Sequence, residues 1–386
     1  MMRIDLLFPA LPPAFDGIGD YTAQLSAHLS AAHVVRVLTA QPNAQAIPGV
    51  RVEPCFSLER RSGVLQVLDS LDDQPPDWLV VQYNPFSWGT YGLNAHLPYL
   101  LWRIKRTIPG VQIAVMFHED FVPVEHWRFA VMTTYQRAQF MALGWLADGV
   151  FFSIGPWANQ YSSWFKGTPV AHLPVGSNIP RSMASPTESR TRWGLTDAGP
   201  VVGVFGTLHE TRLLSHIQCA VALIRQTYDA VHVLYVGPHG DALKDALPDA
   251  PLVDAGRCAA ADVAQAFRAM DVHLAPFKDG ASTRRGSMIA GLNNGVPTVS
   301  TLGPLTDDVL VRYQGAGYKL APVADAEAFA SLARDVVAYP EEQRRLSAAA
   351  TAFHDALFDW RFVAQRMSSK LSHWSTAVTA SPSHGR

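Results

Sequence analysis

Cysteine is scarce in this chain, which has 3 cysteines among 386 residues. Cys55, Cys219 and Cys258 lie far apart, so their spacing does not outline a zinc site, and their odd number does not suit a disulfide framework. We therefore expect a protein of a reducing compartment.

Charge and long apolar runs are also limited. Charged residues make up 17% of the chain and the formal net charge is -2, so there is no general electrostatic reason to expect a nucleic-acid partner. No segment reaches the run of about 18 apolar residues that a transmembrane helix needs, and the opening MMRIDLLFPALPP lacks a signal-peptide cleavage pattern. We expect a cytoplasmic globular protein, and peripheral contact with the inner face of the membrane stays open.

Hydrophobic residues, 48% of the chain, form two successive series of short apolar runs that alternate with helical patterns. This alternation predicts an α/β protein with two Rossmann-like, doubly wound domains that face each other across a cleft. The expected strands are 3–8, 34–39, 78–83, 111–117, 150–154 and 170–173 in the first series, and 201–205, 231–236, 252–254, 272–276 and 298–301 in the second.

Composition sets the expected domain boundaries. We expect an N-terminal, acceptor-side domain over residues 1–180 and a linker over 181–199, which is rich in Ser, Thr, Pro and Arg. A C-terminal, donor-binding domain follows over 200–350. A helix over 351–375 and a polar, disordered tail over 376–386 end the chain.

The loop after the first expected strand carries Gly17 and Gly19 and leads into a helix. In a parallel sheet such a loop lies at the carboxyl edge, where ligands bind. A dinucleotide-binding fingerprint would need a third glycine where Thr22 stands, and an acidic residue after the second strand, which ends in Leu38-Thr39-Ala40-Gln41. We therefore do not expect a nicotinamide cofactor.

Polar side chains follow other strands of the first series. His118 and Glu119 come directly after 111–117, and Tyr83 and Asn84 end the strand at 78–83. A catalytic site at the sheet edge requires such a gathering. A lone histidine is more often structural, so both roles stay open for His118.

The segment 279–287, DGASTRRGS, combines small residues, three hydroxyls and two guanidiniums where the chain enters a helix. Free amide groups, the positive end of the helix dipole and bidentate arginine donors suit an anion such as a phosphate or pyrophosphate. A solvated surface turn, capped by Ser282 or Thr283, explains the same pattern. The sequence alone leaves both interpretations open.

The expected helix over 96–106, HLPYLLWRIKR, also has two interpretations. Its aromatic and basic residues resemble an interfacial pattern that would contact a membrane. The alternative, which we prefer, is an ordinary helix that packs its leucine face on the sheet and leaves the basic residues in solvent.

The order of these segments resembles the retaining glycosyltransferases of the GT-B fold, specifically glycosyltransferase family 4, over nearly the whole chain. FPALPPAFDGIGDYTAQLSAHL resembles the family's first strand, glycine loop and helix, and MFHED resembles the strand that ends in a histidine. HLPVGSNIP, GVFGTLHETRLL and GLNNGVPTVS resemble the turn before the linker, the donor-phosphate turn and the motif that precedes a later strand. The resemblance implies a C-terminal helix that crosses back to the N-terminal domain.

The resemblance also implies which residues hold the donor. It places the donor turn at Gly206 and Thr207. The residues expected to bind the donor phosphates are Gly17, Gly19, Arg212, Ser282, Thr283, Arg284, Arg285, Gly286 and Ser287.

The expected catalytic residues are His118, Glu119 and Asp279. By resemblance, His118 lies near the transferred sugar and Asp279 orients a sugar hydroxyl. We expect the acceptor side to include Tyr21, Tyr83 and Asn84.

Two departures from the family pattern affect the phosphate site. An arginine of the family falls on Thr207, and the second of two family glutamates falls on Ser287 or Ala290, depending on the alignment. In the family that glutamate holds the donor's ribose. We expect Arg284 and Arg285 to compensate for Thr207 by binding the pyrophosphate.

The resemblance therefore implies a retaining glycosyltransferase of bacterial polysaccharide biosynthesis type that uses a nucleotide-diphosphate sugar as co-substrate. The expected acceptor is a glycan, a lipid-linked molecule or a small molecule. No Asp-X-Asp motif ends a strand, so we expect no metal and no other cofactor. Two alternatives stay open: a catalytically silent GT-B protein that binds a partner or senses nucleotides, and a sugar-nucleotide epimerase on the same fold.

Overall fold

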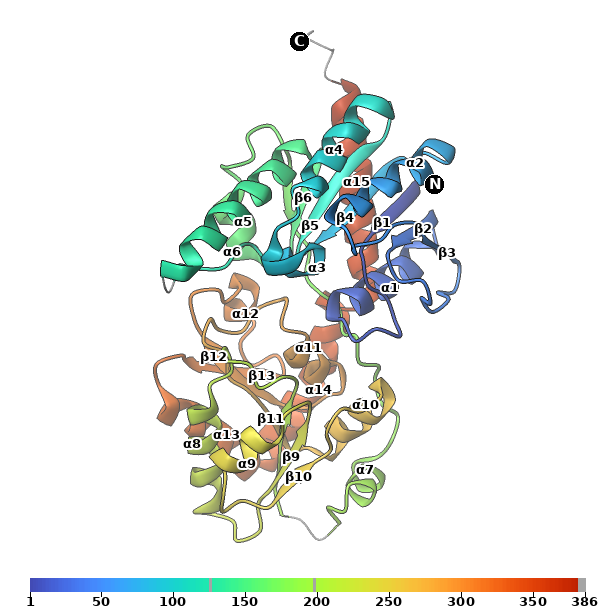
Figure 1. Ribbon diagram of the computed structural model, residues 1–386. Coiled ribbons are helices and arrows are strands. Elements are labelled where there is room, and N and C mark those ends of the chain that lie inside the picture. The colour runs from blue at the N-terminus through green and yellow to red at the C-terminus, as the bar shows by residue number, and fades with distance from the viewer. Residues whose placement is uncertain (125–126, 197–198, 381–386) are drawn as a thin grey trace. The chain divides into compact units, whose positions relative to one another are not determined.

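The computed structural model describes residues 1–124, 127–196 and 199–380. The chain forms two compact units. Unit 1 combines the chain up to Pro174 with the segment that begins at Trp360, and unit 2 comprises Val175–Asp359 (Figure 1). Unit 2 is thus one continuous stretch, whereas unit 1 is assembled from two separate stretches.

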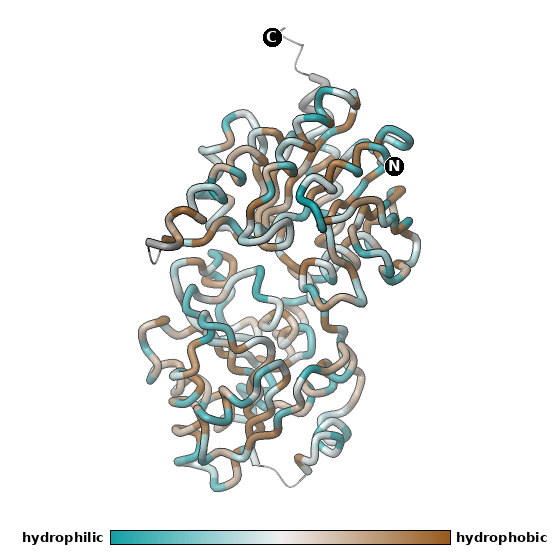
Figure 2. Tube along the Cα trace, in the orientation of Figure 1, coloured by the Kyte–Doolittle hydropathy of each residue, from teal (hydrophilic) through white to brown (hydrophobic). Residues whose placement is uncertain are grey.

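Unit 1 is built on a seven-stranded parallel sheet of order β3-β2-β1-β4-β5-β6-β7. Its strands are β1 (Arg3–Leu7), β2 (Val34–Thr39), β3 (Val50–Pro54), β4 (Trp78–Tyr83), β5 (Gln112–Phe117), β6 (Gly149–Phe152) and β7 (Val170–His172). The central strands are almost entirely buried, as their apolar runs predict, and Figure 2 shows them largely in brown. The strand order reverses between β1 and β4, and ligands of such sheets bind beyond the carboxyl ends of strands at this kind of point.

Helices cover both faces of the unit 1 sheet. They are α1 (Gly17–Leu29), η1 (Arg61–Gln66), α2 (Val67–Asp73), α3 (Pro85–Trp88), η2 (Thr90–Gly92), α4 (His96–Thr107), α5 (Trp127–Leu146), α6 (Gly155–Tyr161) and α15 (Trp360–Ala380). The chain passes from β1 to β2 in one direction along the sheet and from β4 to β6 in the other. Because crossovers between parallel strands are right-handed, α1 covers one face, and α4 and α5 cover the opposite face. Helix α15 packs against α1, and α4 packs against α5 (Figure 1).

Helix α15 supplies core side chains to unit 1. Trp374 is 5% exposed, and its ring centroid lies 4.7 Å from that of Phe151. A Cβ at Gly149 would lie 2.2 Å from the Trp374 ring, so only glycine lets the strand and this ring approach so closely. At the same end of the helix, Ser375 accepts a hydrogen bond of 2.9 Å from Trp78 Nε1. The sheet and the last helix therefore form one core.

Unit 2 has a six-stranded parallel sheet of order β10-β9-β8-β11-β12-β13. Its strands are β8 (Val201–Phe205), β9 (His232–Val236), β10 (Leu252–Asp254), β11 (Val272–Ala275), β12 (Thr298–Leu302) and β13 (Tyr318–Pro322). Its helices are α7 (Pro186–Arg192), α8 (Leu214–Arg225), α9 (Asp241–Ala246), α10 (Ala260–Ala269), α11 (Gly286–Asn293), α12 (Asp308–Arg312), α13 (Ala326–Ala338) and α14 (Pro340–Leu357). One apolar cluster lies under α8 and α13, and a second lies under α10 and α11. The order reverses between β8 and β11, which makes their carboxyl ends the natural ligand edge.

The boundaries in the structure differ from the predicted ones. Within the predicted linker, 181–199, the described residues belong to unit 2, and Pro186–Arg192 form α7, whose first turn has a capping box made by Ser185 and Glu188. The helix predicted over 351–375 is divided between α14 and α15, with the break after Leu357. Helix α15 continues through Ala380, five residues into the segment predicted to be disordered, and the rest of that segment lies outside the described residues.

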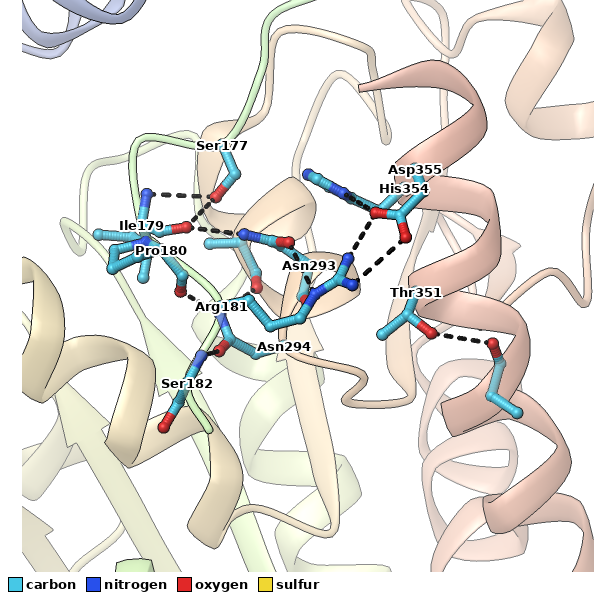
Figure 3. A network of polar contacts seen from close by, with 12 residues as sticks. Ser177, Ile179, Pro180, Arg181, Ser182, Asn293, Asn294, Thr351, His354 and Asp355 are labelled. Carbon is cyan, nitrogen blue, oxygen red and sulfur yellow. Dashed lines mark hydrogen bonds and ion pairs between the residues drawn. The ribbon is translucent and has the colours of Figure 1, made fainter. Parts of the chain in front are cut away.

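Two adjacent asparagines hold the start of unit 2 in place (Figure 3). Asn293 Nδ2 donates to the carbonyl of Ile179, and Asn294 Nδ2 donates to that of Pro180. Asn294 Oδ1 accepts from the amide of Ser182. These side chains replace the backbone partners that an irregular segment lacks.

Candidate functional site

The turn after β8 brings three parts of unit 2 together. Gly206 has φ +101°, a conformation that favours glycine, and its amide donates to the carbonyl of Val236. A Cβ at Gly206 would lie 3.4 Å from Arg212 Nη2 and 3.6 Å from Ser287 Cβ. The turn, Arg212 and the first turn of α11 are therefore neighbours, as the prediction of a common phosphate site requires. Thr207, the next residue of this turn, is exposed.

Arg212 is a buried cation, with 7% of its surface exposed. Its Nη2 donates to the carbonyl of Phe205 at 2.8 Å, while its Nε and Nη1 have no hydrogen-bond partner among the residues that the structure describes. Burial, together with the nearby charge of Arg285, lowers the pKa of Arg212 to about 10, so it remains protonated at neutral pH. A buried charge with vacant donors is costly unless an anion compensates it.

The ring of Phe277 supports two guanidiniums. The Cζ atom of Arg212 lies 4.6 Å from the ring centroid and that of Arg285 lies 4.4 Å from it. The negative face of an aromatic ring attracts such cations and helps to hold them near each other despite their repulsion. Phe277 was not among the predicted site residues.

Asp279 pairs with both arginines of the loop. Arg284 Nη2 lies 3.0 Å from Asp279 Oδ2, and Arg285 forms a second ion pair with Asp279 Oδ1. The local group thus contains three guanidiniums and one carboxylate, and all of these side chains are largely buried or half-buried. The predicted sugar-binding carboxylate and the predicted pyrophosphate ligands therefore contact one another.

The shape of the same loop depends on contacts with the segment after β12. Asp307 Oδ2 accepts from the amide and the hydroxyl of Thr283, at 2.7 and 3.0 Å. Gly280 has φ +93°, and a Cβ there would lie 2.3 Å from Thr306 Oγ1, so this position requires glycine. Ser282 Oγ is buried and has no partner within the described ranges. A polar group in that state is a candidate for a ligand contact.

Helix α11 begins at Gly286 directly after these arginines. Arg285 stands at the N-cap position and gives no side-chain cap. The positive end of the helix dipole adds to the charge of the three guanidiniums and favours an anion here. Gly286 and Ser287 lie in this first turn, as predicted.

In unit 1, the first turn of α1 is capped by an acid. Asp16 Oδ1 accepts from the amides of Ile18 and Gly19, at 2.9 and 2.8 Å. A Cβ at Gly19 would lie 2.8 Å from the carbonyl oxygen of Ala10, whereas a Cβ at Gly17 would meet nothing within 4 Å. Gly19 thus serves close packing of the loop, and a phosphate at this turn would have to displace Asp16 from two amides.

His118 lies just beyond β5 in a buried cluster. Its Nε2 lies within hydrogen-bond distance of Gln82 Oε1, at 2.8 Å. The Tyr21 ring meets the His118 ring edge-on at 4.7 Å, and Trp360 lies on another side of Tyr21 at 5.2 Å. Burial raises the pKa of Tyr21, so Tyr21 stays neutral, and its hydroxyl has no partner in the described part of the chain. Glu119, the next residue after His118, is half-buried.

Tyr83 and Asn84 have structural contacts. Tyr83 is fully buried, and its hydroxyl accepts from Gln139 Nε2 at 2.9 Å. Asn84 Oδ1 caps α3 by accepting from the amide of Phe86. Their predicted contact with an acceptor stays a prediction.

Some site residues were missed by sequence reasoning. Gln82 is the only amide in the apolar strand WLVVQY, a signal that could have singled it out, since a buried amide needs a partner. Asp307 and Phe277 gave no such signal, because their importance comes from contacts with Thr283 and with Arg212.

Comparison with known proteins identifies the fold. No protein-family model matches the chain, and no curated protein matches it in sequence. Similar solved structures include sucrose-phosphate synthase from Thermosynechococcus elongatus, with 16% identity, a TM-score of 0.76, and coverage of 98% of this chain and 100% of that chain.

Two further structures have the same fold. The Anabaena protein HepE, solved in complex with UDP-glucose, has 14% identity and a TM-score of 0.67 over 97% of this chain and 100% of its own. WaaG, a glycosyltransferase involved in lipopolysaccharide biosynthesis, has 13% identity and a TM-score of 0.66 over 96% and 99%. With two parallel-sheet, Rossmann-like units and these neighbours, the chain has the GT-B fold.

Proposed function

We propose that this protein is a retaining glycosyltransferase that binds a nucleotide-diphosphate sugar in unit 2. The observation that carries the proposal is Arg212, a buried cation with two donor atoms that have no partner among the described residues. It lies beside a second cation, Arg285, at the ligand edge of the sheet. A diphosphate would supply the missing negative charge and accept from those donors. Support also comes from the GT-B neighbours, one of which was solved with UDP-glucose.

The proposed chemistry uses fixed positive charge. When the bond between sugar and phosphate breaks, negative charge builds on the leaving diphosphate, and preorganised donors stabilise it. Arg212 and the first turn of α11 would provide these donors, and Arg284 and Arg285 would join them after release from Asp279. No metal is required in this scheme.

The proposed sugar site uses unit 1. The His118 ring would contact the sugar or its developing charge, and the hydrogen bond to Gln82 orients the ring. We place a glycan or lipid-linked acceptor on this side, with front-face attack and retention of configuration.

The first test is thermal stabilisation by UDP, GDP, ADP and TDP at millimolar concentration, with and without EDTA. A ligand at about 100 times its dissociation constant adds roughly 2.7 kcal/mol, which raises the melting temperature by several degrees. We expect one nucleotide to stand out and EDTA to make no difference. If none of the four raises the melting temperature, the donor-site assignment is wrong, and a shift that EDTA removes would overturn metal independence.

Asp279→Asn should tighten diphosphate binding. Asp279 competes with a diphosphate for Arg284 and Arg285, so removal of its charge should lower the dissociation constant about fivefold, the effect of roughly 1 kcal/mol. Turnover should fall, because Asp279 is also proposed to orient a sugar hydroxyl. Calorimetric titration and initial rates measure the two effects.

A matched control is Asp262→Asn, which removes another carboxylate paired with an arginine, Arg192, at the surface of unit 2. This variant should change neither the dissociation constant of the diphosphate nor turnover. Weaker diphosphate binding by Asp279→Asn would contradict competition and would show that Asp279 holds the arginines in their binding positions.

A catalytically silent nucleotide sensor remains the second candidate. The positions that match the missing family glutamate are Ser287 and Ala290, and neither side chain has a carboxylate that could bind a ribose. Ala290 is also fully buried. Hydrolysis or transfer of any nucleotide sugar would rule out this candidate. An epimerase would convert the donor without an acceptor, which product analysis detects.

A further inference from the structure

Helix α4 has an inner face that explains its packing. Leu97, Leu100, Leu101 and Ile104 are all fully buried, and the helix packs against α5 and η1. This confirms the interpretation of an ordinary amphipathic helix for the inner face. It does not account for the large aromatic residues on the opposite face.

The outer face of α4 carries Tyr99, Trp102, Arg103 and Arg106, which we call the α4 stripe. These positions are three, four and seven residues apart, so they lie along one side of the helix. Tyr99 is 42% exposed and Trp102 is 41% exposed, although exposed rings gain nothing from the core.

The members of the α4 stripe contact one another. The Tyr99 and Trp102 rings are stacked, with centroids 5.6 Å apart and an interplanar angle of 22°. The Arg106 guanidinium lies over the Trp102 ring at 5.4 Å, and Arg103 Nη1 lies 3.4 Å from Tyr99 Oη. The stripe is therefore an ordered surface of two rings flanked by two cations.

The two cations of the stripe are available to a partner. Among the described residues neither Arg103 nor Arg106 forms an ion pair, whereas Lys105 on the same helix binds Asp148 at 2.7 Å. Basic residues in the last turn stabilise a helix through its dipole, which explains Lys105 and Arg106 in part. The dipole does not explain the two exposed rings beside them.

We propose that the α4 stripe binds the surface of an anionic phospholipid bilayer. Tyrosine and tryptophan rings are favoured at the level of the lipid headgroups, and arginines there bind phosphates of negative charge. None of the described helices has the length and apolar composition of a membrane span. The rings provide the apolar contact and the arginines provide charge complementarity.

The test is co-sedimentation of the full chain with vesicles of phosphatidylcholine alone and of phosphatidylcholine with phosphatidylglycerol. We expect binding only to the vesicles that contain the anionic lipid, and weaker binding at high salt. Each basic residue near such a surface contributes about fivefold in affinity, so Arg103→Glu with Arg106→Glu should weaken binding by about 30-fold or more. Tyr99→Ser with Trp102→Ser should weaken it as well, and the binding that remains should still fall at high salt, because both arginines are kept.

The control variant is Arg366→Glu with Lys370→Glu. Both residues are exposed on α15, on the other face of the unit 1 sheet, and the change in net charge is the same. This variant should bind vesicles as the wild type does, and melting curves check that every variant is folded.

Two outcomes would overturn the proposal: no binding of the wild type to anionic vesicles, or equal binding by the wild type and the Arg103→Glu, Arg106→Glu variant. The first would direct attention to a protein partner for the stripe. The assay contains no nucleotide, so its result does not depend on the proposed transferase function.

Discussion

Arg212→Met should abolish diphosphate binding without lowering the stability of the free protein. The variant loses few contacts of the buried guanidinium: one hydrogen bond, from Nη2 to Phe205, and the contact with the Phe277 ring. Nε and Nη1 have no partner among the described residues. Replacing a buried ion pair with apolar side chains of similar volume is often neutral or stabilising by about 1–4 kcal/mol, and a buried charge without a counter-ion has still less to lose. Turnover should fall by about 100-fold or more, the usual effect of removing one electrostatic donor.

The combination of lost binding and retained stability separates a ligand-binding arginine from a structural one. Arg268→Met is the matched control, because Arg268 donates to the carbonyls of Ala184 and Asn294. It should lower the melting temperature and leave diphosphate affinity unchanged. Arg212→Lys should keep part of the affinity. If Arg212→Met binds diphosphate as well as the wild type does, the proposed donor site is wrong.

Trp374→Ala should lower the free energy of unfolding by about 3–5 kcal/mol, as expected for a large aromatic side chain removed from a core. The ring lies against Phe151 and fills the space above Gly149. Denaturant titration, followed through a spectroscopic signal from unit 1, measures the change in the free energy of unfolding.

Phe362→Ala is the control on the same helix. Phe362 is 46% exposed, so its removal should change the unfolding free energy by no more than about 0.5 kcal/mol. Equal losses for the two variants would show that the α15 core contacts contribute less than their burial indicates.

Much of the fold could be predicted from the sequence because buried parallel strands are short, continuous apolar runs. The strands β3 and β13 were not predicted, and both lie at sheet edges, where side chains are partly exposed and the apolar run is interrupted. The predicted linker was read from its polar composition. The capping box of Ser185 and Glu188 was in the sequence, but the packing of α7 on α10 was not.

The candidate site was predicted less completely, because its contacts join residues that are distant in the sequence. Glycines and arginines in the loop before α11 indicated an anion site. The pairing of Asp279 with Arg284 and Arg285 was not foreseen, although the residues are only five and six positions apart. The partners of His118 and Thr283 lie 36 and 24 positions away, at Gln82 and Asp307, and no local pattern reveals such pairs.

The assembly of unit 1 from two stretches of chain has a consequence for synthesis. Domains usually fold in the order in which they leave the ribosome. Here unit 2 is complete once Asp359 has emerged, whereas the unit 1 sheet must wait for Trp374 to cover Gly149 and Phe151. During translation of some 200 residues this apolar surface stays open. The first half of the nascent chain is therefore the part that needs protection from aggregation until the last helix arrives.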